Sequence, residues 1–345
     1  MTDVTIDFPH KQTTHCESGA MINLLRFHGL DISEPMAFGI GGGIFFGYFP
    51  FLRMAHIRVT TFRKMPGAIY SKGLKRLGIA YQSSTFFRRQ SAQDTLDRLL
   101  DRGVPVGCQV GLFWLPYVPR AMRTHFNAHS IVIYGRSGEQ YLVSEPGMEH
   151  VQTLERADLE RARFAKGGLN PRGRVYWLKE DRSPKQVDLV APILAGLKDT
   201  CYSMLDIPMP VLGVKGMRAL ARDFAKWKIR LTEEEVRHNI NQIVMMQEVV
   251  GSGGAGFRFM FAAFLAEAAA VLSSPDLGQA GLDMTVLGDR WREFALLAAR
   301  HVKNRTHAGD TYETMIDMLY ELADREEAAY RRLRVITREL IAAHP

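Results

Sequence analysis

The sequence HCESGAMINLL, residues 15–25, decides how the first part of the chain is interpreted, because it places Cys16 at the start of a helix. Thr13 and Thr14 precede the cysteine and are suitable capping residues, and apolar residues then recur at helical spacing until Gly29. We therefore expect a short amphipathic helix with a thiol in its first turn.

A thiol at the N-terminus of a helix lies near the positive end of the helix dipole and near unpaired backbone N–H groups. Both favour the thiolate, which is the nucleophilic form of cysteine. The plain alternative is that Cys16 is a small buried apolar residue. A second stretch of sequence favours the nucleophile.

This second stretch is NAHSIVIYGRSGEQYLVSEPG, residues 127–147, and it has the pattern of a β-hairpin. Two β-rich runs, 129–134 and 140–144, flank a short turn bounded by glycines. If the turn centres on Ser137, each residue i lies opposite residue 274 − i, so His129 faces Glu145. Directly opposed residues share a face of the sheet, so these two side chains are expected to touch.

Cys16, His129 and Glu145 together have the composition of a catalytic triad. An imidazole accepts the thiol proton, and a carboxylate orients the ring and stabilises its cation. The alternative is that His129 begins a strand by chance and Glu145 is a solvated strand end. We adopt the triad as the working hypothesis because a helix-terminal cysteine accompanies the pair.

Composition limits the class of protein. The chain has 345 residues, of which 46% are hydrophobic and 23% charged, as in ordinary globular proteins. The first eleven residues lack the apolar core of a secretory signal, and no apolar run approaches the roughly 20 residues of a membrane span. Three widely spaced cysteines argue against disulfides and against a zinc site. We expect a cytoplasmic protein without a metal and without a membrane span.

The length favours two domains, 1–185 and 186–345, joined by a charged linker at 179–185. Residues 1–185 hold 25 Lys/Arg against 16 Asp/Glu, whereas residues 186–345 hold 19 against 21. The basic first domain predicts an acidic partner surface or a phosphate-bearing ligand, although a solvated surface explains it equally well. The basic residues are scattered and no nucleic-acid motif accompanies them, so nucleic acid is not expected as a partner.

Periodicity predicts the remaining elements. Strands are expected at 57–62, 79–83, 104–110 and 174–178, the last closing the sheet, and Cys108 is expected in the core. Helices are expected at 67–77 and at 91–102, where Ser91 is the cap. Five further helices are expected at 217–227, 233–250, 257–272, 282–302 and 311–342.

Two glycine-rich stretches have two interpretations each. Gly41, Gly42 and Gly43 lack the residues of a nucleotide-binding loop, so they form either a tight turn beside the first helix or the lining of a substrate path. The stretch 251–258 either connects two helices or brings backbone N–H groups and Arg258 to an anionic group.

The two decisive stretches, with the glycines at 39–43 and the later run GSGGAGFR at 251–258, resemble the butirosin biosynthesis protein H family over nearly the whole chain. The resemblance implies an α+β fold: a papain-like cysteine peptidase-type N-terminal domain with an antiparallel sheet, followed by an all-α domain. It makes Cys16 the nucleophile, His129 the base and Glu145 the orienting acid. Relatives usually carry Asp or Asn in the last place, and an upstream glutamine for the oxyanion, for which Gln12 is the candidate.

The namesake of the family moves an aminoacyl group from an acyl carrier protein thioester to an aminoglycoside amine. The expected function is therefore an acyltransferase of secondary-metabolite biosynthesis that works through a Cys16 acyl-enzyme. Its partners are an acyl carrier protein and a small-molecule amine, and its only cofactor is the phosphopantetheine arm that arrives on the carrier. The rivals are a cysteine peptidase or amidase with the same triad, and a non-catalytic scaffold.

Overall fold

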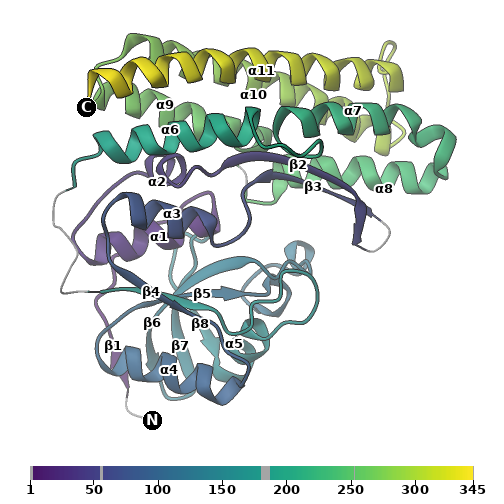
Figure 1. Cartoon of the computed structure of the whole chain (residues 1–345). Helices are drawn as coiled ribbons and strands as arrows, with labels where there is room; N and C mark the ends of the chain where they lie inside the picture. The colour runs from purple at the N-terminus through teal and green to yellow at the C-terminus, as the bar shows by residue number, and fades with distance from the viewer. Residues whose placement is uncertain (1–2, 55–56, 180–186, 252, 345) are drawn as a thin grey trace. The chain divides into compact units, whose positions relative to one another are not determined.

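The computed structural model describes residues 3–54, 57–179, 187–251 and 253–344, which form two compact units (Figure 1). The first unit comprises Met1–Ala37 and Leu74–Val187, and the second comprises Phe38–Gly73 and Asp188–Pro345. Residues 38–73, expected in the first domain, are thus grouped with the second unit. Most of the expected linker, residues 180–185, lies outside the described residues.

The described part of the first unit contains a seven-stranded sheet in which every pairing is antiparallel. The order is β4-β9-β5-β6-β7-β8, and β1 also pairs with β6. The strands are β1 (Val4–Thr5), β4 (Tyr81–Ser84), β5 (Val106–Val110), β6 (His129–Ser137), β7 (Gln140–Ser144), β8 (Gln152–Glu155) and β9 (Val175–Leu178). The predicted hairpin is β6 and β7, whereas the strand predicted to close the sheet, β9, lies between β4 and β5.

Helices accompany this sheet in the first unit. They include α1 (Cys16–Phe27), α4 (Arg89–Asp101) and α5 (Arg156–Arg163), with 3₁₀ turns η1 (Leu112–Trp114) and η2 (Arg120–Met122). The core between α4, α5 and the sheet includes Cys108, which is fully buried as predicted. Ser91 is not the cap of α4, because the helix begins two residues earlier, after Arg88.

Two helices continue past the boundary between the units, α2 (Glu34–Ile40) and α3 (Ala68–Arg76). The rest of the second unit contains the hairpin β2 (Ile44–Met54) and β3 (Ile57–Arg63) and a set of long helices. These are α6 (Val190–Leu205), α7 (Gly213–Arg230), α8 (Glu233–Val244), α9 (Arg258–Val271), α10 (Pro275–Val302) and α11 (Tyr312–Ala343). A π-helical segment, Met245–Val249, follows α8, and a 3₁₀ turn, Ala255–Phe257, precedes α9.

The five helices predicted for the C-terminal region are all present, with shifted ends. The start of α10 lies seven residues before the prediction, because Ser274 caps the helix and Pro275 fits its first position. The prediction missed α6, whose Pro192 lies in the first turn, where proline is tolerated. The expected class, α+β with an antiparallel sheet and then helices, is confirmed.

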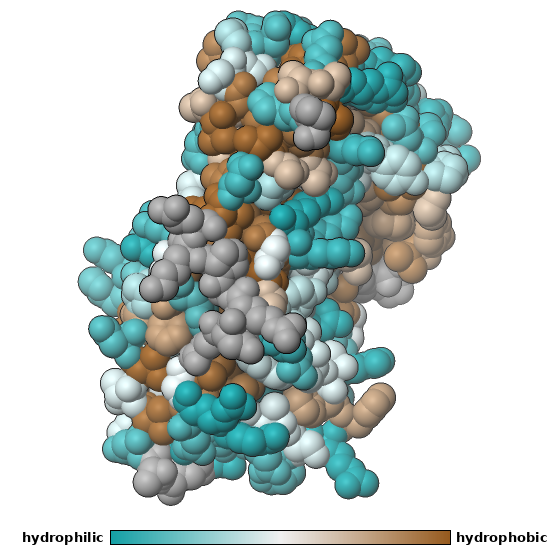
Figure 2. All heavy atoms as spheres, turned by 60° about the vertical axis from the view of Figure 1, so that its left-hand side comes forward, coloured by the Kyte–Doolittle hydropathy of each residue, from teal (hydrophilic) through white to brown (hydrophobic). Residues whose placement is uncertain are grey.

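Side chains on the visible face of Figure 2 are a mixture of hydrophilic residues with smaller hydrophobic patches between them. Within the described ranges, no helix combines the length and the apolar character that crossing a bilayer requires.

Candidate active site

The N-terminus of α1 presents Cys16 as the first helical residue, as the sequence predicts. The cap is His15 rather than Thr13 or Thr14: the Ser18 backbone N–H donates to His15 Nδ1 at 3.3 Å. Neither threonine is the cap because the helix begins directly after His15; their backbone N–H groups bind Pro146 O and a carboxylate. The cysteine is partly exposed, so a substrate can reach its sulfur.

That carboxylate belongs to Glu34, which fixes the segment before the nucleophile. It accepts the backbone N–H of Thr14 at 2.9 Å, the backbone N–H of His15 at 2.8 Å and the Ser18 hydroxyl at 3.0 Å. Burial raises the pKa of Glu34, and these hydrogen bonds partly oppose that rise. No sequence signal links Glu34 to the site, since it follows Cys16 by a full helix and a turn.

His129 and Glu145 are in contact, as the hairpin predicts. His129 Nε2 lies 2.9 Å from both Glu145 carboxylate oxygens. The side chains are 13% and 3% exposed, respectively, so the pair is largely shielded from water. A buried charge-assisted hydrogen bond of this kind is stronger than one between neutral groups.

The register that produces this contact differs from the prediction. The turn is shorter than expected, since Ser137 pairs directly with Gln140. A β-bulge between Ile133 and Gly135 then places one extra residue in β6. Beyond the bulge the numbers of two paired residues add up to 276, as for Ile133 and Val143, whereas the prediction required 274. The register prediction was therefore wrong by two residues, which keeps the same face.

The bulge is what places the pair on one face. Before it the paired numbers sum to 277, which would turn Glu145 to the face opposite that of His129. After the bulge, extending the same register one residue past the end of β7 places Glu145 opposite Ile131. Ile131 is two residues from His129, so it lies on the same face of the sheet. Glu145 and His129 are diagonal neighbours, farther apart than a directly opposed pair. A glutamate spans that distance, which explains why it replaces the usual shorter Asp or Asn.

Two further donors hold the Glu145 carboxylate. The Tyr117 hydroxyl donates to one oxygen at 3.1 Å, and the Gly147 backbone N–H donates to the other at 3.2 Å. Burial, and then the charge of Glu145, raise the pKa of Tyr117 well above its usual range, so the phenol stays a neutral donor. The sequence analysis missed Tyr117, which lies in the polar loop before β6.

Cys16 lies beside His129 and contributes to the electrostatics of its ring. Because Glu145 occupies Nε2, Nδ1 remains for the sulfur. Burial alone would lower the pKa of His129, but the charges of Glu145 and Cys16 raise it well above its ordinary value. The arrangement thus favours the imidazolium form of His129.

A buried polar network connects α1 with the end of β7. Asn23 Nδ2 donates to Lys11 O at 3.0 Å and to Ser144 Oγ at 3.3 Å, and Asn23 Oδ1 accepts the Lys11 N–H at 3.1 Å. His10 Nδ1 lies 2.8 Å from the same serine hydroxyl. Gln12, the oxyanion candidate, is exposed and donates to Gly147 O at 3.2 Å. These contacts tie the residues before Cys16 to the turn after Glu145.

The expected substrate-binding residues lie in the second unit and have structural contacts there. A side chain at Gly41 would collide with Ile69, and one at Gly43 would collide with Phe38; Gly42 has the positive φ of 62° that a tight turn requires. The glycines therefore form a tight turn, and their part in lining a substrate path stays a prediction.

Arg258 is fully buried and bonded at each guanidinium nitrogen. It donates to Glu326 at 2.8 and 2.9 Å and to Gly256 O at 2.7 Å. A side chain held in this way is not available to an incoming anion, so its expected binding role has no support from the geometry. Its role is to join α9 to α11.

Comparison with known proteins gives two family models in chain order. Residues 15–146 match "Butirosin biosynthesis protein H, N-terminal", and residues 157–333, about half of the chain, match a domain of unknown function, DUF4872. A solved structure from Bacillus anthracis, described as a C39-like peptidase, covers 53% of this chain and 100% of its own, with 14% identity and a TM-score of 0.39. No curated protein matches. Since the two models together match most of the residues, the chain belongs to the butirosin biosynthesis protein H-like family.

Proposed function

We propose that this protein is a cysteine-dependent acyltransferase. It takes an acyl or aminoacyl group from an acyl carrier protein thioester and transfers it to an amine through an acyl-enzyme on Cys16. The observation that carries the proposal is the order of the residues at the site: Cys16 begins α1 and lies beside His129, whose Nε2 forms a hydrogen bond with the buried Glu145. The name of the matched N-terminal family supports a biosynthetic role.

In the first step the Cys16 thiolate attacks the thioester carbonyl, forming a C–S bond and an oxyanion. The intermediate expels the carrier thiolate, which takes the proton from the His129 imidazolium. The exchange replaces one thioester with another, so positioning and oxyanion stabilisation supply most of the catalysis. The first backbone N–H groups of α1 are suited to the oxyanion, and the Gln12 amide remains a candidate second donor.

In the second step a neutral amine attacks the acyl-enzyme, and neutral His129 accepts the proton that the amine loses. Collapse of the intermediate breaks the C–S bond and expels the Cys16 thiolate. The imidazolium and thiolate are restored, so the proton balance of the cycle closes. Glu145 holds the ring through Nε2 and stabilises the cation that forms in each cycle.

Intact-protein mass spectrometry tests the proposal. The wild-type chain is incubated with carrier proteins that bear a panel of acyl thioesters, and then with a panel of amines. We expect a mass increase of one acyl group, which hydrolyses slowly and is discharged rapidly by a suitable amine. Rapid discharge by water alone would instead indicate a peptidase or amidase.

The matched controls are the other two cysteines. Cys16→Ala should abolish the adduct, whereas Cys108→Ala and Cys201→Ala should retain it. Burial raises the pKa of Cys108 to about 11 and that of Cys201 to about 12, so both thiols stay protonated and unreactive. An adduct that persists in Cys16→Ala, or no wild-type adduct with any thioester, would refute the proposal.

A further inference from the structure

The second unit is more basic than the sequence analysis assumed, because it includes residues 38–73. Residues 38–73 hold five Lys/Arg and no Asp/Glu, and the structure groups them with the helical unit. Helix α7 adds six basic residues against a single acid, Asp223. The basic residues of α7 are Lys215, Arg218, Arg222, Lys226, Lys228 and Arg230.

These two elements enclose a groove of about 380 Å³. Strand β2 lies beside the segment that precedes α7. The Tyr48 N–H donates to Val211 O at 2.9 Å, and Gly47 forms a β-bridge with Leu212. The groove is lined on the strand side by Tyr48 and Pro50, and on the helix side by Ala219, Arg222, Asp223, Lys226 and Arg230.

The one carboxylate of this lining is already neutralised. Asp223 accepts the Tyr48 hydroxyl and, at 3.1 Å, the Trp227 indole N–H. Arg58 lies 3.2 Å away and Arg230 lies 3.8 Å away. Asp223 therefore serves to hold the groove together rather than to repel anions.

The charges of Arg222 and Lys226, unlike that of Asp223, are not compensated. Both are exposed, and neither has a carboxylate partner among the described residues. With Arg230 they follow one another at four-residue intervals, a span of about 12 Å along the helix at 1.5 Å per residue. The groove thus presents a row of three cations, of which Arg230 shares the Asp223 carboxylate and the other two have no carboxylate partner among the described residues.

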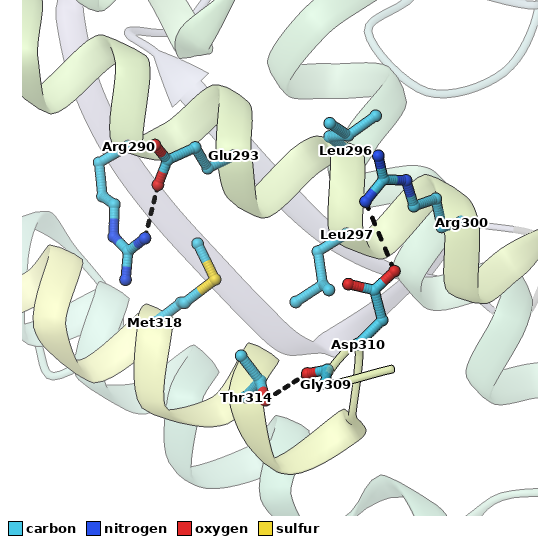
Figure 3. A pocket seen from close by; sticks show the side chains of 9 residues that line it. All are labelled: Arg290, Glu293, Leu296, Leu297, Arg300, Gly309, Asp310, Thr314 and Met318. Carbon is cyan, nitrogen blue, oxygen red and sulfur yellow. Dashed lines mark hydrogen bonds and ion pairs between the residues drawn. The ribbon is translucent and has the colours of Figure 1, made fainter. Parts of the chain in front are cut away.

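A second cavity in this unit, of about 250 Å³ between α10 and α11, shows the contrast (Figure 3). Its arginines are paired within the cavity itself: Arg290 with Glu293 at 2.5 Å, and Arg300 with Asp310 at 3.5 Å. Because its charges are already compensated, this cavity carries no comparable attraction for an anion.

We infer that the groove between β2 and α7 is the docking surface for an acidic helix of the acyl carrier protein, an inference that rests on the proposed function. A row of cations about 12 Å long is too extended for one phosphate but matches carboxylates on successive turns of a helix. Apolar side chains on the same two elements, Phe51, Leu52 and Ile229, are 67%, 51% and 87% exposed. Exposed apolar residues beside unpaired cations are typical of a surface that binds a protein.

The test compares two donors of the same acyl group, the carrier protein and free pantetheine, with the full chain as enzyme. The variant Arg222→Glu with Lys226→Glu reverses two charges of the groove. We expect its kcat/KM with the carrier thioester to fall about tenfold at low salt, mainly through KM, because complementary charges accelerate association. Its rate with the pantetheine thioester should equal that of the wild type. Salt at about 0.5 M should shrink the difference, since it screens the charges.

The matched control is Arg305→Glu with Arg338→Glu, which makes the same change of net charge at two exposed arginines outside the groove lining. It should behave as the wild type with both donors. A carrier protein whose acidic helix residues are replaced by lysine should react better with the charge-reversed variant than with the wild type.

The outcomes separate the two proposals. If neither donor acylates wild-type Cys16, the proposed function fails. If both donors acylate it and the groove variant is as fast as its control with the carrier, the function stands and the docking inference is overturned. Binding of a short nucleic acid to the groove, without competition from the carrier protein, would also overturn it.

Discussion

Glu145 allows two substitutions that separate the charge of the side chain from its reach. Glu145→Gln keeps the length: its amide oxygen can still accept from His129 and Gly147, and its NH₂ can donate to the Tyr117 hydroxyl. Glu145→Asp keeps the charge but shortens the side chain by one methylene, about 1.5 Å. The present contact of 2.9 Å would then lengthen to about 4 Å, beyond hydrogen-bonding distance.

The magnitudes follow from the lost interaction. Glu145→Gln exchanges a charge-assisted hydrogen bond for a neutral one, a loss of about 1–2 kcal/mol, or about 5- to 30-fold in the acylation rate. Glu145→Asp loses the bond itself, about 1.5–3 kcal/mol, or about 13- to 160-fold. Because the pair is diagonal, we expect the aspartate variant to be the slower of the two.

The pH dependence of the reaction shows whether the charge of Glu145 acts on His129. Because Glu145 raises the pKa of His129, its imidazolium persists to higher pH in the wild type. The departing carrier thiolate takes its proton from this imidazolium, so the alkaline fall of the acylation rate should move to lower pH in Glu145→Gln. The stability that the raised pKa contributes is fully present below the ordinary histidine value of 6.5 and is lost as pH rises through the raised value. The stability deficit of Glu145→Gln should accordingly be larger at pH 6 than at pH 10.

Stopped-flow acylation at neutral pH, the same acylation assay from pH 5 to 10 and urea unfolding measure the three effects. Tyr117→Phe is the control, since it removes one hydrogen bond to Glu145 but keeps both its charge and its contact with His129. The reasoning would be refuted if both Glu145 variants acylated at the wild-type rate, or if the alkaline fall did not move in Glu145→Gln.

Three further predictions concern the support of the site and of the second unit. Glu34→Ala should lower stability by about 1–3 kcal/mol and slow acylation, because two donors before Cys16 and the Ser18 hydroxyl after it lose their acceptor; urea unfolding and stopped-flow acylation check both. Asn23→Ala should destabilise by a similar amount, and unchanged unfolding would contradict the buried network. Arg258→Met should cost about 3–5 kcal/mol by leaving Glu326 buried and unpaired, whereas adding Glu326→Met should recover part of the loss in a double-mutant cycle.

Local sequence patterns predicted the elements of the site well. The helical period placed Cys16 at a helix N-terminus, and the alternation in 127–147 identified the hairpin and placed His129 at the start of its first strand. The His129–Glu145 contact followed from the pleat, because an error of two residues in the register preserves the face.

Features that depend on distant parts of the chain were not predictable in this way. The bulge near Tyr134 was missed because Gly135, a residue type that often marks a bulge within a strand, was assigned to the turn. Glu34 reaches the loop before Cys16 only through tertiary structure. For the same reason, the grouping of residues 38–73 with the helical unit depends on contacts made after residue 188.

The bulge in β6 also limits how the length of this hairpin can vary. Removing or adding a single residue between His129 and Glu145 would reverse the facing of one of them, whereas a change of two would not. Insertions and deletions in this hairpin should therefore be tolerated when they change its length by an even number of residues. A one-residue change in the turn should be tolerated only when the bulge is lost at the same time. Chains aligned through this hairpin should be compared by counting residues from the bulge to each end, because the parity of those counts determines whether the histidine and the acid can meet.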